Sequence, residues 1–350
     1  MKVGFLIYGS LDTLSGGYLY DRKLVEYLRE AGDTVEIISL PWRNYAAHLT
    51  DNFRFRLPPD FDLLIQDELN HPSLLTANTR PRNYPVISLV HHLRCSEQRP
   101  GWQNWFYQQV EKCYLNTVDG FIFNSKTTKN VVSGLVVSRK PFVIGYPPTD
   151  RFGHPVTEDE AVARAHETGP LRLLFLGNVI HRKGLHTLLR AIRHQPSAFS
   201  LDVVGGLSAE PKYVAKMMEK TKQYGKSKIS FHGALDNEAL IEKMKSSHVL
   251  VVPSSYEGFG IVYLEGMAFG LPSIGTTAGA APELIEDGKT GFLIPPDDAE
   301  TLRNQLFTLA KDRDLLEKMS LQALHRYRQQ PTWNETAGQI RNFLHRMIER

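Results

Sequence analysis

Short apolar runs alternate with amphipathic stretches along most of this chain. The first run covers residues 2–9, apolar positions then recur at helical spacing between residues 19 and 28, and a second run covers residues 34–40. This order of strand, helix and strand predicts a βαβ unit with parallel strands. Further strands in the first half are expected at 62–66, 85–90, 120–124 and 142–146. The first half therefore predicts an open parallel sheet.

The same alternation begins again at residue 171, after a segment rich in proline and glycine. Strands are expected at 171–176, 199–204, 229–233, 249–253, 272–276 and 291–295, and helices at 185–194, 236–246, 260–269, 280–286 and 298–311. We therefore expect an α/β protein with two Rossmann-like, doubly wound parallel-sheet domains facing across a cleft, formed by residues 1–148 and 171–332. Residues 149–170 are expected to be a linker without a strand.

Length, charge and cysteine content exclude several classes of protein. The 350 residues exceed the roughly 250–300 at which one hydrophobic core stops growing, so two domains are expected. A net charge of +3 is too small for a protein that coats nucleic acid, and no apolar run approaches the roughly 20 residues of a membrane-spanning helix. Cys95 and Cys113 have neither metal-site spacing nor disulfide-scaffold density. We expect a cytoplasmic protein without a structural metal.

A basic loop follows the first strand of the second half. Gly177 ends that strand, and Arg182 and Lys183 stand just before Gly184, where a helix is expected to begin. Two cations beside backbone N–H groups at a helix entry favour an anion, and a diphosphate fits best. The alternative is an ordinary solvated basic loop.

A second loop, Pro253–Gly260, follows a later strand. This loop and the helix behind it each carry one glutamate, and the two glutamates are eight residues apart. Gly258 and Gly260, on either side of Phe259, allow backbone N–H groups to approach a ligand closely. Glu257 lies in the loop and is placed to contact sugar hydroxyls. Glu265 lies on an otherwise apolar helix face, where a buried carboxylate needs donors such as the two hydroxyls of a ribose. A buried ion pair with a neighbouring lysine or arginine is the alternative for Glu265.

With these residues in place, the sequence resembles the retaining nucleotide-sugar glycosyltransferases of the GT-B fold, in particular glycosyltransferase family 4 (glycosyl transferases group 1). The best-matched stretch is 249–276, which carries the family's pair of glutamates as Glu257 and Glu265. Supporting matches are Ser15–Tyr18, Asn124–Lys126, Arg182–Gly184 and the loop 279–285. The family often has an arginine at the position of Asn178, so no role is carried over to that residue, and Arg182 is the candidate replacement.

The resemblance also implies roles for these residues. Arg182 and Lys183 neutralise the leaving diphosphate, Glu257 contacts the transferred sugar and Glu265 holds the ribose, while Gly16 and Gly17 lie near the diphosphate and the acceptor. Donor contacts are thus expected at Glu265, Gly258, Phe259, Gly260, Gly16, Gly17 and Gly177, and catalytic contacts at Glu257, His91, Lys183 and Arg182.

The family histidine resembles His91, which closes the fourth strand together with His92, and either ring is a candidate to face the site. A neutral imidazole at that position is expected to hydrogen-bond a sugar hydroxyl or a backbone carbonyl. Asn124 and Ser125, after the fifth strand, are expected on the acceptor side. A helical stripe in 333–350 resembles the family's C-terminal helix, which crosses back onto the first domain.

The expected reaction moves a sugar from a nucleoside-diphosphate sugar to a hydroxyl acceptor (glycan, lipid-linked or small molecule) with retention, without a metal and without a cofactor. A sugar phosphorylase, a disaccharide-phosphate synthase and a non-catalytic nucleotide-sugar-binding protein are the alternatives. Aromatic residues at 102–107 indicate either a peripheral contact with the inner face of a membrane or a packed helix. The nucleotide base, the sugar, the acceptor and the oligomeric state have no readable pattern.

Overall fold

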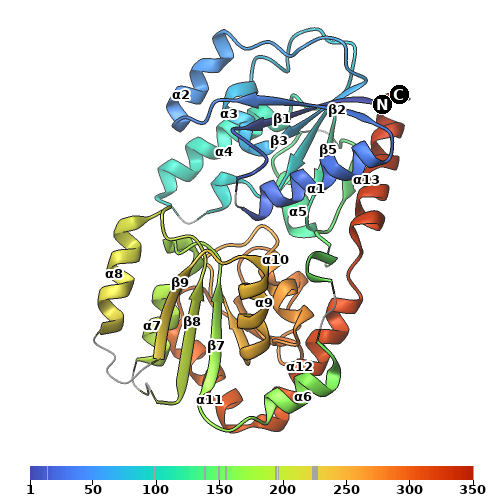
Figure 1. Ribbon diagram of the computed structural model, residues 1–350. Coiled ribbons are helices and arrows are strands. Elements are labelled where there is room, and N and C mark those ends of the chain that lie inside the picture. Colours follow the sequence, from blue (N-terminus) through green and yellow to red (C-terminus); the bar gives the residue numbers. More distant parts are fainter. Residues whose placement is uncertain are drawn as a thin grey trace. The chain divides into compact units, whose positions relative to one another are not determined.

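The chain divides into two compact units, which are described separately. The computed structural model describes residues 1–13, 15–97, 99–137, 139–148, 150–153, 156–193, 195, 197–222 and 228–349. Unit 1 consists of Met1–Pro148 and Pro331–Arg350, and unit 2 of Thr149–Gln330 (Figure 1).

Unit 1 is built on a parallel six-stranded sheet with the strand order β2-β1-β3-β4-β5-β6. Its strands are β1 (Lys2–Tyr8), β2 (Thr34–Leu40), β3 (Leu63–Asp67), β4 (Val86–Val90), β5 (Gly120–Phe123) and β6 (Phe142–Ile144). All residues of β3, β4 and β5 are buried. Helices on both faces of the sheet cause this, and it explains why these strands appear in the sequence as continuous apolar runs.

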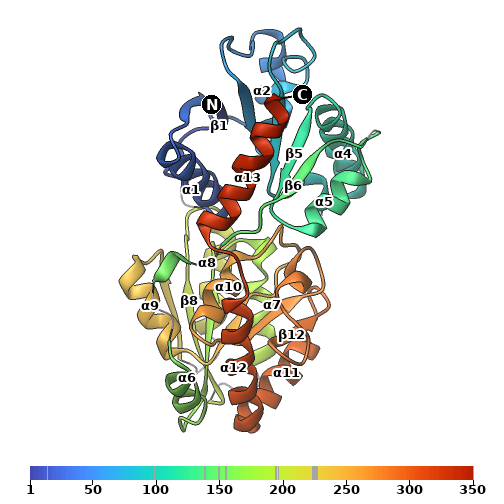
Figure 2. The ribbon, with the colours of Figure 1, turned by 90° about the vertical axis from the view of Figure 1, so that its right-hand side faces the viewer.

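The helices of unit 1 form one layer on each face of the sheet. They are α1 (Gly16–Glu30), α2 (Tyr45–Leu49), α3 (His71–Leu74), α4 (Gly101–Leu115), α5 (Lys126–Ser133) and α13 (Trp333–Ile348), with short 3-10 helices at Thr50–Phe53, Glu68–Asn70 and Arg94–Ser96. The C-terminal helix α13 packs against α1 and β6, and its Ile340, Phe343 and Leu344 are buried in the core that includes β1 (Figure 2).

Unit 2 contains a second parallel six-stranded sheet with the order β12-β11-β10-β7-β8-β9. Its strands are β7 (Leu171–Leu176), β8 (Phe199–Val204), β9 (Lys228–Gly233), β10 (Val249–Val251), β11 (Ser273–Thr276) and β12 (Gly291–Ile294). Its helices are α6 (Glu158–Ala165), α7 (Leu185–Ile192), α8 (Pro211–Lys222), α9 (Asn237–Ser246), α10 (Ile261–Ala268), α11 (Ala299–Lys311) and α12 (Arg313–Arg328), with 3-10 turns at Asp150–Phe152, His181–Lys183 and Ala281–Glu283. The prediction of an α/β fold with two parallel sheets is confirmed.

The expected linker at 149–170 is corrected by the structure. Helix α6 lies in this segment, begins with a capping box of Thr157 and Glu160, and packs against α12 with Ala161 and Ala165 buried. The buried Arg164 guanidinium donates to the carbonyl oxygens of Phe269 and Gly270, at 2.7 and 2.9 Å. These contacts make α6 part of unit 2. Thr149, His154 and Pro155 lie outside the described residues.

Candidate active site

The two motif loops of unit 2 meet where its strand order reverses. Strands β7 and β10 are hydrogen-bonded neighbours, with β8 beyond β7 on one side and β11 beyond β10 on the other. Loops at such a switch point leave a ligand-binding crevice at the carboxyl ends of the strands. The loop after β7 carries Gly177–Gly184, and the loop after β10 carries Pro253–Gly260, so topology brings the two predicted motifs to one place.

Glycine allows these two loops to touch backbone to backbone. Gly184 has φ +74°, and a Cβ there would lie 2.0 Å from the carbonyl oxygen of Pro253. The Ser255 N–H donates to the Arg182 carbonyl at 2.8 Å. A side chain at residue 184 would push the loops apart, so the close approach of the basic pair to the second loop depends on this glycine.

Lys183, Arg182 and Glu257 form one cluster. Lys183 Nζ lies 2.6 Å from Glu257 Oε1, and Arg182 Nη1 lies 3.8 Å from Glu257 Oε2 and donates to the Tyr256 carbonyl at 2.7 Å. The Ser254 hydroxyl also donates to Glu257. Burial opposes ionisation of Glu257, but the two cations and the hydrogen bonds outweigh it, so the pKa of Glu257 is lower than usual. The cluster holds two cations against one ionised carboxylate and remains attractive to an anion.

The glycines of the second loop lead directly into α10. Gly260 has φ +90° and is the N-cap of α10, so no side chain caps the first N–H groups from that position. Gly258 lies in the loop before it, and the Phe259 side chain is 4% exposed and belongs to the core. The ring of Phe259 is therefore packed within unit 2, and the donor contact expected at this residue stays a prediction.

Gly177 leaves room for the lysine. It has φ +132°, and a Cβ there would lie 3.4 Å from Cε of Lys183. Asn178 Oδ1 accepts a hydrogen bond from the Gly206 N–H at 3.2 Å, so the residue that replaces the family's arginine joins the loops after β7 and β8.

Glu265 on α10 is 6% exposed and forms an ion pair with Arg151. The buried ion pair that the sequence left as an alternative is therefore present. Burial raises the pKa of Glu265, while Arg151 and the more distant Lys183 act in the opposite direction. Arg151 also donates to Asn237 Oδ1 at 3.2 Å. Sequence reasoning missed Arg151, because it lies in the segment that we expected to be a linker.

His91, Asp21 and Gly17 lie together in unit 1. His91 Nε2 is 2.8 Å from Oδ1 of Asp21, which is fully buried on α1. A Cβ at Gly17 would lie 3.2 Å from Cδ2 of His91, and Gly16 precedes it as the first residue of α1. His92 instead pairs with Glu97, at 3.0 Å. No motif or apolar pattern pointed to Asp21.

The charge on His91 corrects the expectation of a neutral ring. Burial alone would lower its pKa, but Asp21, with smaller contributions from Asp67 and Glu68, raises the pKa of His91 to about 9. His91 is therefore an imidazolium at neutral pH and donates from its ring nitrogens. It cannot accept a proton there.

Asn124 and Ser125 hold the loops around His91. Asn124 Nδ2 donates to the His91 carbonyl at 2.8 Å, and the buried Ser125 hydroxyl caps α5 by accepting from the Thr128 N–H at 3.0 Å. Both side chains thus make hydrogen bonds within unit 1. The expected contact of Asn124 and Ser125 with an acceptor stays a prediction.

Two groups of side chains among the described residues have metal-ligand spacing, and both lie in unit 1. They are Asp21, Asp67 and His91, and Glu68, His71 and Glu111. In the first group His91 is a cation bonded to Asp21, and in the second Glu111 accepts the backbone N–H groups of Arg94 and Cys95. Neither arrangement leaves a full ligand set free.

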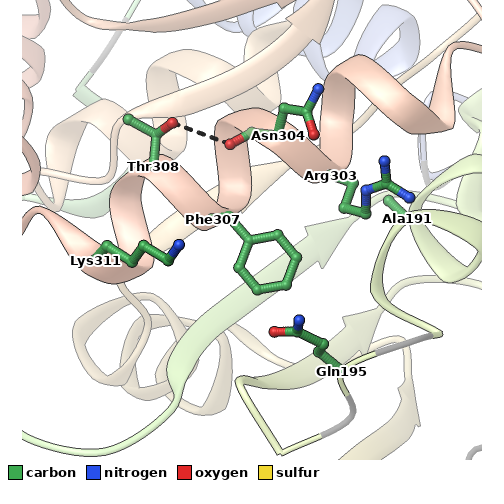
Figure 3. Close-up of a pocket in the computed structure, with 7 residues that line it drawn as sticks. All are labelled: Ala191, Gln195, Arg303, Asn304, Phe307, Thr308 and Lys311. Carbon is green, nitrogen blue, oxygen red and sulfur yellow. Dashed lines mark hydrogen bonds between the residues drawn. The ribbon is translucent and has the colours of Figure 1, made fainter.

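A cavity of about 550 Å³ in unit 2 lies apart from the motif loops. It lies between the end of α7 and helix α11, and Phe307 points from α11 toward Gln195 (Figure 3). None of the predicted site residues lines it. We therefore place the candidate site at the switch point.

Residues 156–326 match the family model described as Glycosyl transferases group 1. The D-rhamnosyltransferase WbpZ of Pseudomonas aeruginosa is 29% identical over 228 residues, which are 64% of this chain and 58% of that protein. An uncharacterized 41.2 kDa protein in the cps region of Klebsiella pneumoniae is 25% identical over 62% of this chain and 59% of its own length. The chain thus matches less than two thirds of the length of these relatives.

Solved structures share the fold of the chain. Sucrose-phosphate synthase (tll1590) from Thermosynechococcus elongatus superposes with a TM-score of 0.82 at 20% identity over 99% of both chains. Anabaena Alr3699/HepE, solved in complex with UDP and glucose, gives 0.76 at 19% identity over 99% of both chains. At these identities the likeness shows the fold.

No helix within the described residues is both long and apolar enough to cross a membrane.

Proposed function

Because residues 156–326 match the family model of Glycosyl transferases group 1, we propose that this chain transfers a sugar from a nucleoside-diphosphate sugar to a hydroxyl group of an acceptor. The observation that carries the proposal is the cluster of Lys183, Arg182 and Glu257 at the switch point of unit 2. It combines cations for a diphosphate with a carboxylate for a sugar hydroxyl.

The cations act on the leaving group. Negative charge develops on the diphosphate as its bond to the sugar breaks, and positive groups fixed in advance stabilise that charge without having to reorganise. Lys183 is 13% exposed and held by Glu257, so its position is set before the donor arrives. When a diphosphate binds Lys183 in place of Glu257, the Glu257 carboxylate becomes available to accept a hydrogen bond from a hydroxyl of the transferred sugar.

Glu265 is proposed to bind the two ribose hydroxyls of the donor. This role needs an ionised carboxylate that can accept two hydrogen bonds, and the Arg151 partner favours that ionised form against the effect of burial. Anabaena Alr3699/HepE has the same fold and was solved in complex with UDP and glucose, which supports a nucleotide-sugar donor for this chain.

Retention of the anomeric configuration and independence from metal and cofactor also belong to the proposal. The charge on the leaving diphosphate is balanced by Lys183 and Arg182, so the chemistry assigned to a metal ion in other transferases has protein groups to perform it. The leaving phosphate is proposed to accept the proton of the attacking hydroxyl. His91, as a cation, is proposed to donate a hydrogen bond to a substrate oxygen and not to act as the base.

A cytoplasmic location with a peripheral membrane contact is a proposal as well. Trp102, Trp105 and Phe106, in the first two turns of α4, are 71%, 64% and 40% exposed. Exposed rings of this kind support an interfacial contact. The other end of α4 packs in unit 1, with Tyr114 and Leu115 buried. Co-sedimentation with anionic phospholipid vesicles, compared with a Trp102→Ala/Trp105→Ala variant, tests this contact.

The test of the function is a donor panel. UDP-, GDP-, ADP- and dTDP-sugars are incubated with the full chain, with and without candidate acceptors, in EDTA, and the nucleoside diphosphate and the anomeric configuration of the product are measured. We expect acceptor-dependent release from at least one donor and a retained configuration. Orthophosphate-dependent cleavage of a disaccharide would favour the phosphorylase alternative, and activity that only added metal restores would exclude the metal-free mechanism.

A further inference from the structure

Helix α7 begins directly behind Arg182 and Lys183 without a capping side chain. Its N-cap residue is Gly184, which has no side chain to accept the first N–H groups of the helix. A serine, threonine, aspartate or asparagine at the N-cap normally does this. None of them fits at residue 184, because a Cβ there would lie 2.0 Å from the carbonyl oxygen of Pro253. The close packing of the two motif loops therefore leaves the first turn of α7 in need of an acceptor from elsewhere.

Tyr213, on the neighbouring helix α8, supplies that acceptor. The N–H of His186, the second residue of α7, donates to the Tyr213 hydroxyl oxygen at 3.1 Å. This N–H is one of those that an N-cap side chain otherwise satisfies. The same hydroxyl lies 2.8 Å from Nδ1 of the His186 ring. One tyrosine hydroxyl thus contacts both the backbone and the side chain of a residue that lies three positions after Lys183.

The charge states of the two side chains set the direction of these hydrogen bonds. Burial raises the pKa of Tyr213 to about 12, so its hydroxyl keeps its proton and can donate. Burial lowers the pKa of His186, His181 adds to this effect, and Asp297 acts in the opposite direction. The His186 ring is therefore neutral at neutral pH, and the Tyr213 hydroxyl donates to its Nδ1. Nε2 then carries the ring proton and faces Asp297 Oδ1 at 3.4 Å.

The turn that carries the two cations, His181–Lys183, is attached to the same residues. The His181 ring stacks on the His186 ring, with centroids 4.5 Å apart and planes 23° apart, and meets the Tyr213 ring edge to face at 5.6 Å. The His181 N–H donates to Oε2 of Glu210, directly before α8, at 2.9 Å. A ring stack and a backbone hydrogen bond thus fix this turn to the start of α8.

We propose that Tyr213 is a positioning residue for the diphosphate of the donor: its hydroxyl caps α7 and fixes the His186 ring, and these contacts hold Arg182 and Lys183 where the diphosphate binds. The inference rests on the proposed function, because it concerns the same pair of cations. Tyr213 acts through the turn His181–Lys183 and needs no contact with the donor.

The experiment measures the binding of nucleoside diphosphates to the full chain. UDP, GDP, ADP and dTDP are titrated up to millimolar concentration, and ligand-observed NMR gives the dissociation constants. Tyr213→Phe removes only the hydroxyl and should weaken the binding of the best ligand about three- to tenfold. Thr221→Val is the matched control, because it removes another hydroxyl of α8, one that donates to the Met218 carbonyl within the helix. This control should bind as the parent does.

His186 is tested with two substitutions of similar size. His186→Asn keeps an acceptor close to the position of Nδ1 and should bind like the parent. His186→Leu has no acceptor for the Tyr213 hydroxyl and should weaken binding about three- to tenfold. Melting curves on both variants confirm folding, so the comparison separates the hydrogen bond from the packing of the side chain.

A double-mutant cycle with Lys183→Ala tests whether Tyr213 acts through the cations. When the lysine is absent, the hydroxyl has less left to position. Tyr213→Phe should therefore weaken binding by no more than about twofold in the Lys183→Ala background, compared with three- to tenfold in the parent. A purely structural effect of Tyr213 on unit 2 would instead give additive losses.

Three results would overturn the inference while the parent binds a nucleoside diphosphate: Tyr213→Phe binds as the parent does, His186→Asn and His186→Leu lose equal affinity, or the losses in the cycle are additive. Each of them would leave the proposed function standing. If the parent binds none of the four nucleoside diphosphates, both the donor site and the inference are rejected.

Discussion

The two units share an architecture and differ in the chemistry at the same edge of the sheet. At the switch point of unit 2, Lys183 and Arg182 surround Glu257 and lower its pKa. In unit 1, Asp67 and Glu68 are buried at the equivalent edge, and burial raises the pKa of each to about 8. The fold therefore places carboxylates at the same edge of both sheets, and their surroundings set their pKa in opposite directions: two cations lower it in unit 2, and burial raises it in unit 1.

The largest effect is expected from Lys183→Ala. Loss of one fixed cation beside the leaving diphosphate should lower kcat/KM for the donor by about 10²–10³-fold. Steady-state kinetics with the best donor of the panel measure this. Lys212→Ala, which removes an exposed lysine of α8, is the control and should behave as the parent. Equal losses in the two variants would mean that Lys183 has no special place in the reaction.

Glu265→Gln should raise the donor KM by about ten- to a hundredfold, because the amide accepts fewer hydrogen bonds and leaves a ribose hydroxyl and Arg151 without their partner. The effect should be smaller for a 2′-deoxy donor, which has one hydroxyl fewer to lose. A double comparison of both donors on both enzymes gives the coupling. An equal penalty on the two donors would assign Glu265 to the fold of unit 2 alone.

Asp21→Asn should move the alkaline limb of the pH–rate profile. The active form of His91 is the imidazolium, so activity is present below its pKa and is lost as the pH rises through about 9. Without the Asp21 carboxylate the limb should move down toward the ordinary value of about 6.5. His91→Gln should be slow at every pH and lack this limb. An alkaline limb that stays in place in Asp21→Asn would show that His91 does not cause it.

Glu68→Gln should stabilise unit 1 at alkaline pH. The folded-state pKa of Glu68, about 8, lies above the ordinary value of about 4.5. Ionisation of Glu68 therefore stabilises the unfolded chain once the pH exceeds about 4.5, whereas it stabilises the folded chain only near pH 8. The free energy of unfolding of the variant should therefore exceed that of the parent by at least about 1 kcal/mol at pH 8, and the two should converge below pH 4.5. Urea melts at both pH values decide. A difference independent of pH would contradict a raised pKa.

The smallest effects concern two capping boxes, one in each unit. Thr332→Ala removes the N-cap of α13, and Thr157→Ala removes that of α6, and each should cost about 1 kcal/mol. Hydrogen exchange should show the loss in unit 1 for Thr332→Ala and in unit 2 for Thr157→Ala. The reverse pattern would contradict the assignment of α6 to unit 2 and of α13 to unit 1.

The sequence predicted well whatever depends on local pattern. The apolar runs located the strands of both sheets, and the glycines at 177, 184 and 260 indicated loops that have to pass close to other backbone, which the positive φ angles explain. The carboxyl ends of parallel strands share one edge of a sheet. The order of strands and loops along the chain therefore sufficed to predict that the basic pair and Glu257 lie close together.

Contacts between residues far apart in the chain could not be predicted this way. Arg151 is 114 residues from Glu265, and Asp21 is 70 residues from His91. No periodicity connects such partners. The pairing of His91 with Asp21 gives the histidine a positive charge, where a neutral ring was expected. The contact of Tyr213 with His186 was missed for the same reason, since the two residues are 27 positions apart and lie on different helices.

Hydrogen exchange of the full chain with and without its nucleoside diphosphate tests the central claim most directly. We expect the ligand to protect the amides of 177–184 and 253–260 in unit 2 and to leave the amides of 67–74 in unit 1 unchanged. We also expect Lys183→Ala to remove the protection in unit 2. Protection confined to unit 1, or protection in unit 2 that survives the loss of Lys183, would contradict the central claim.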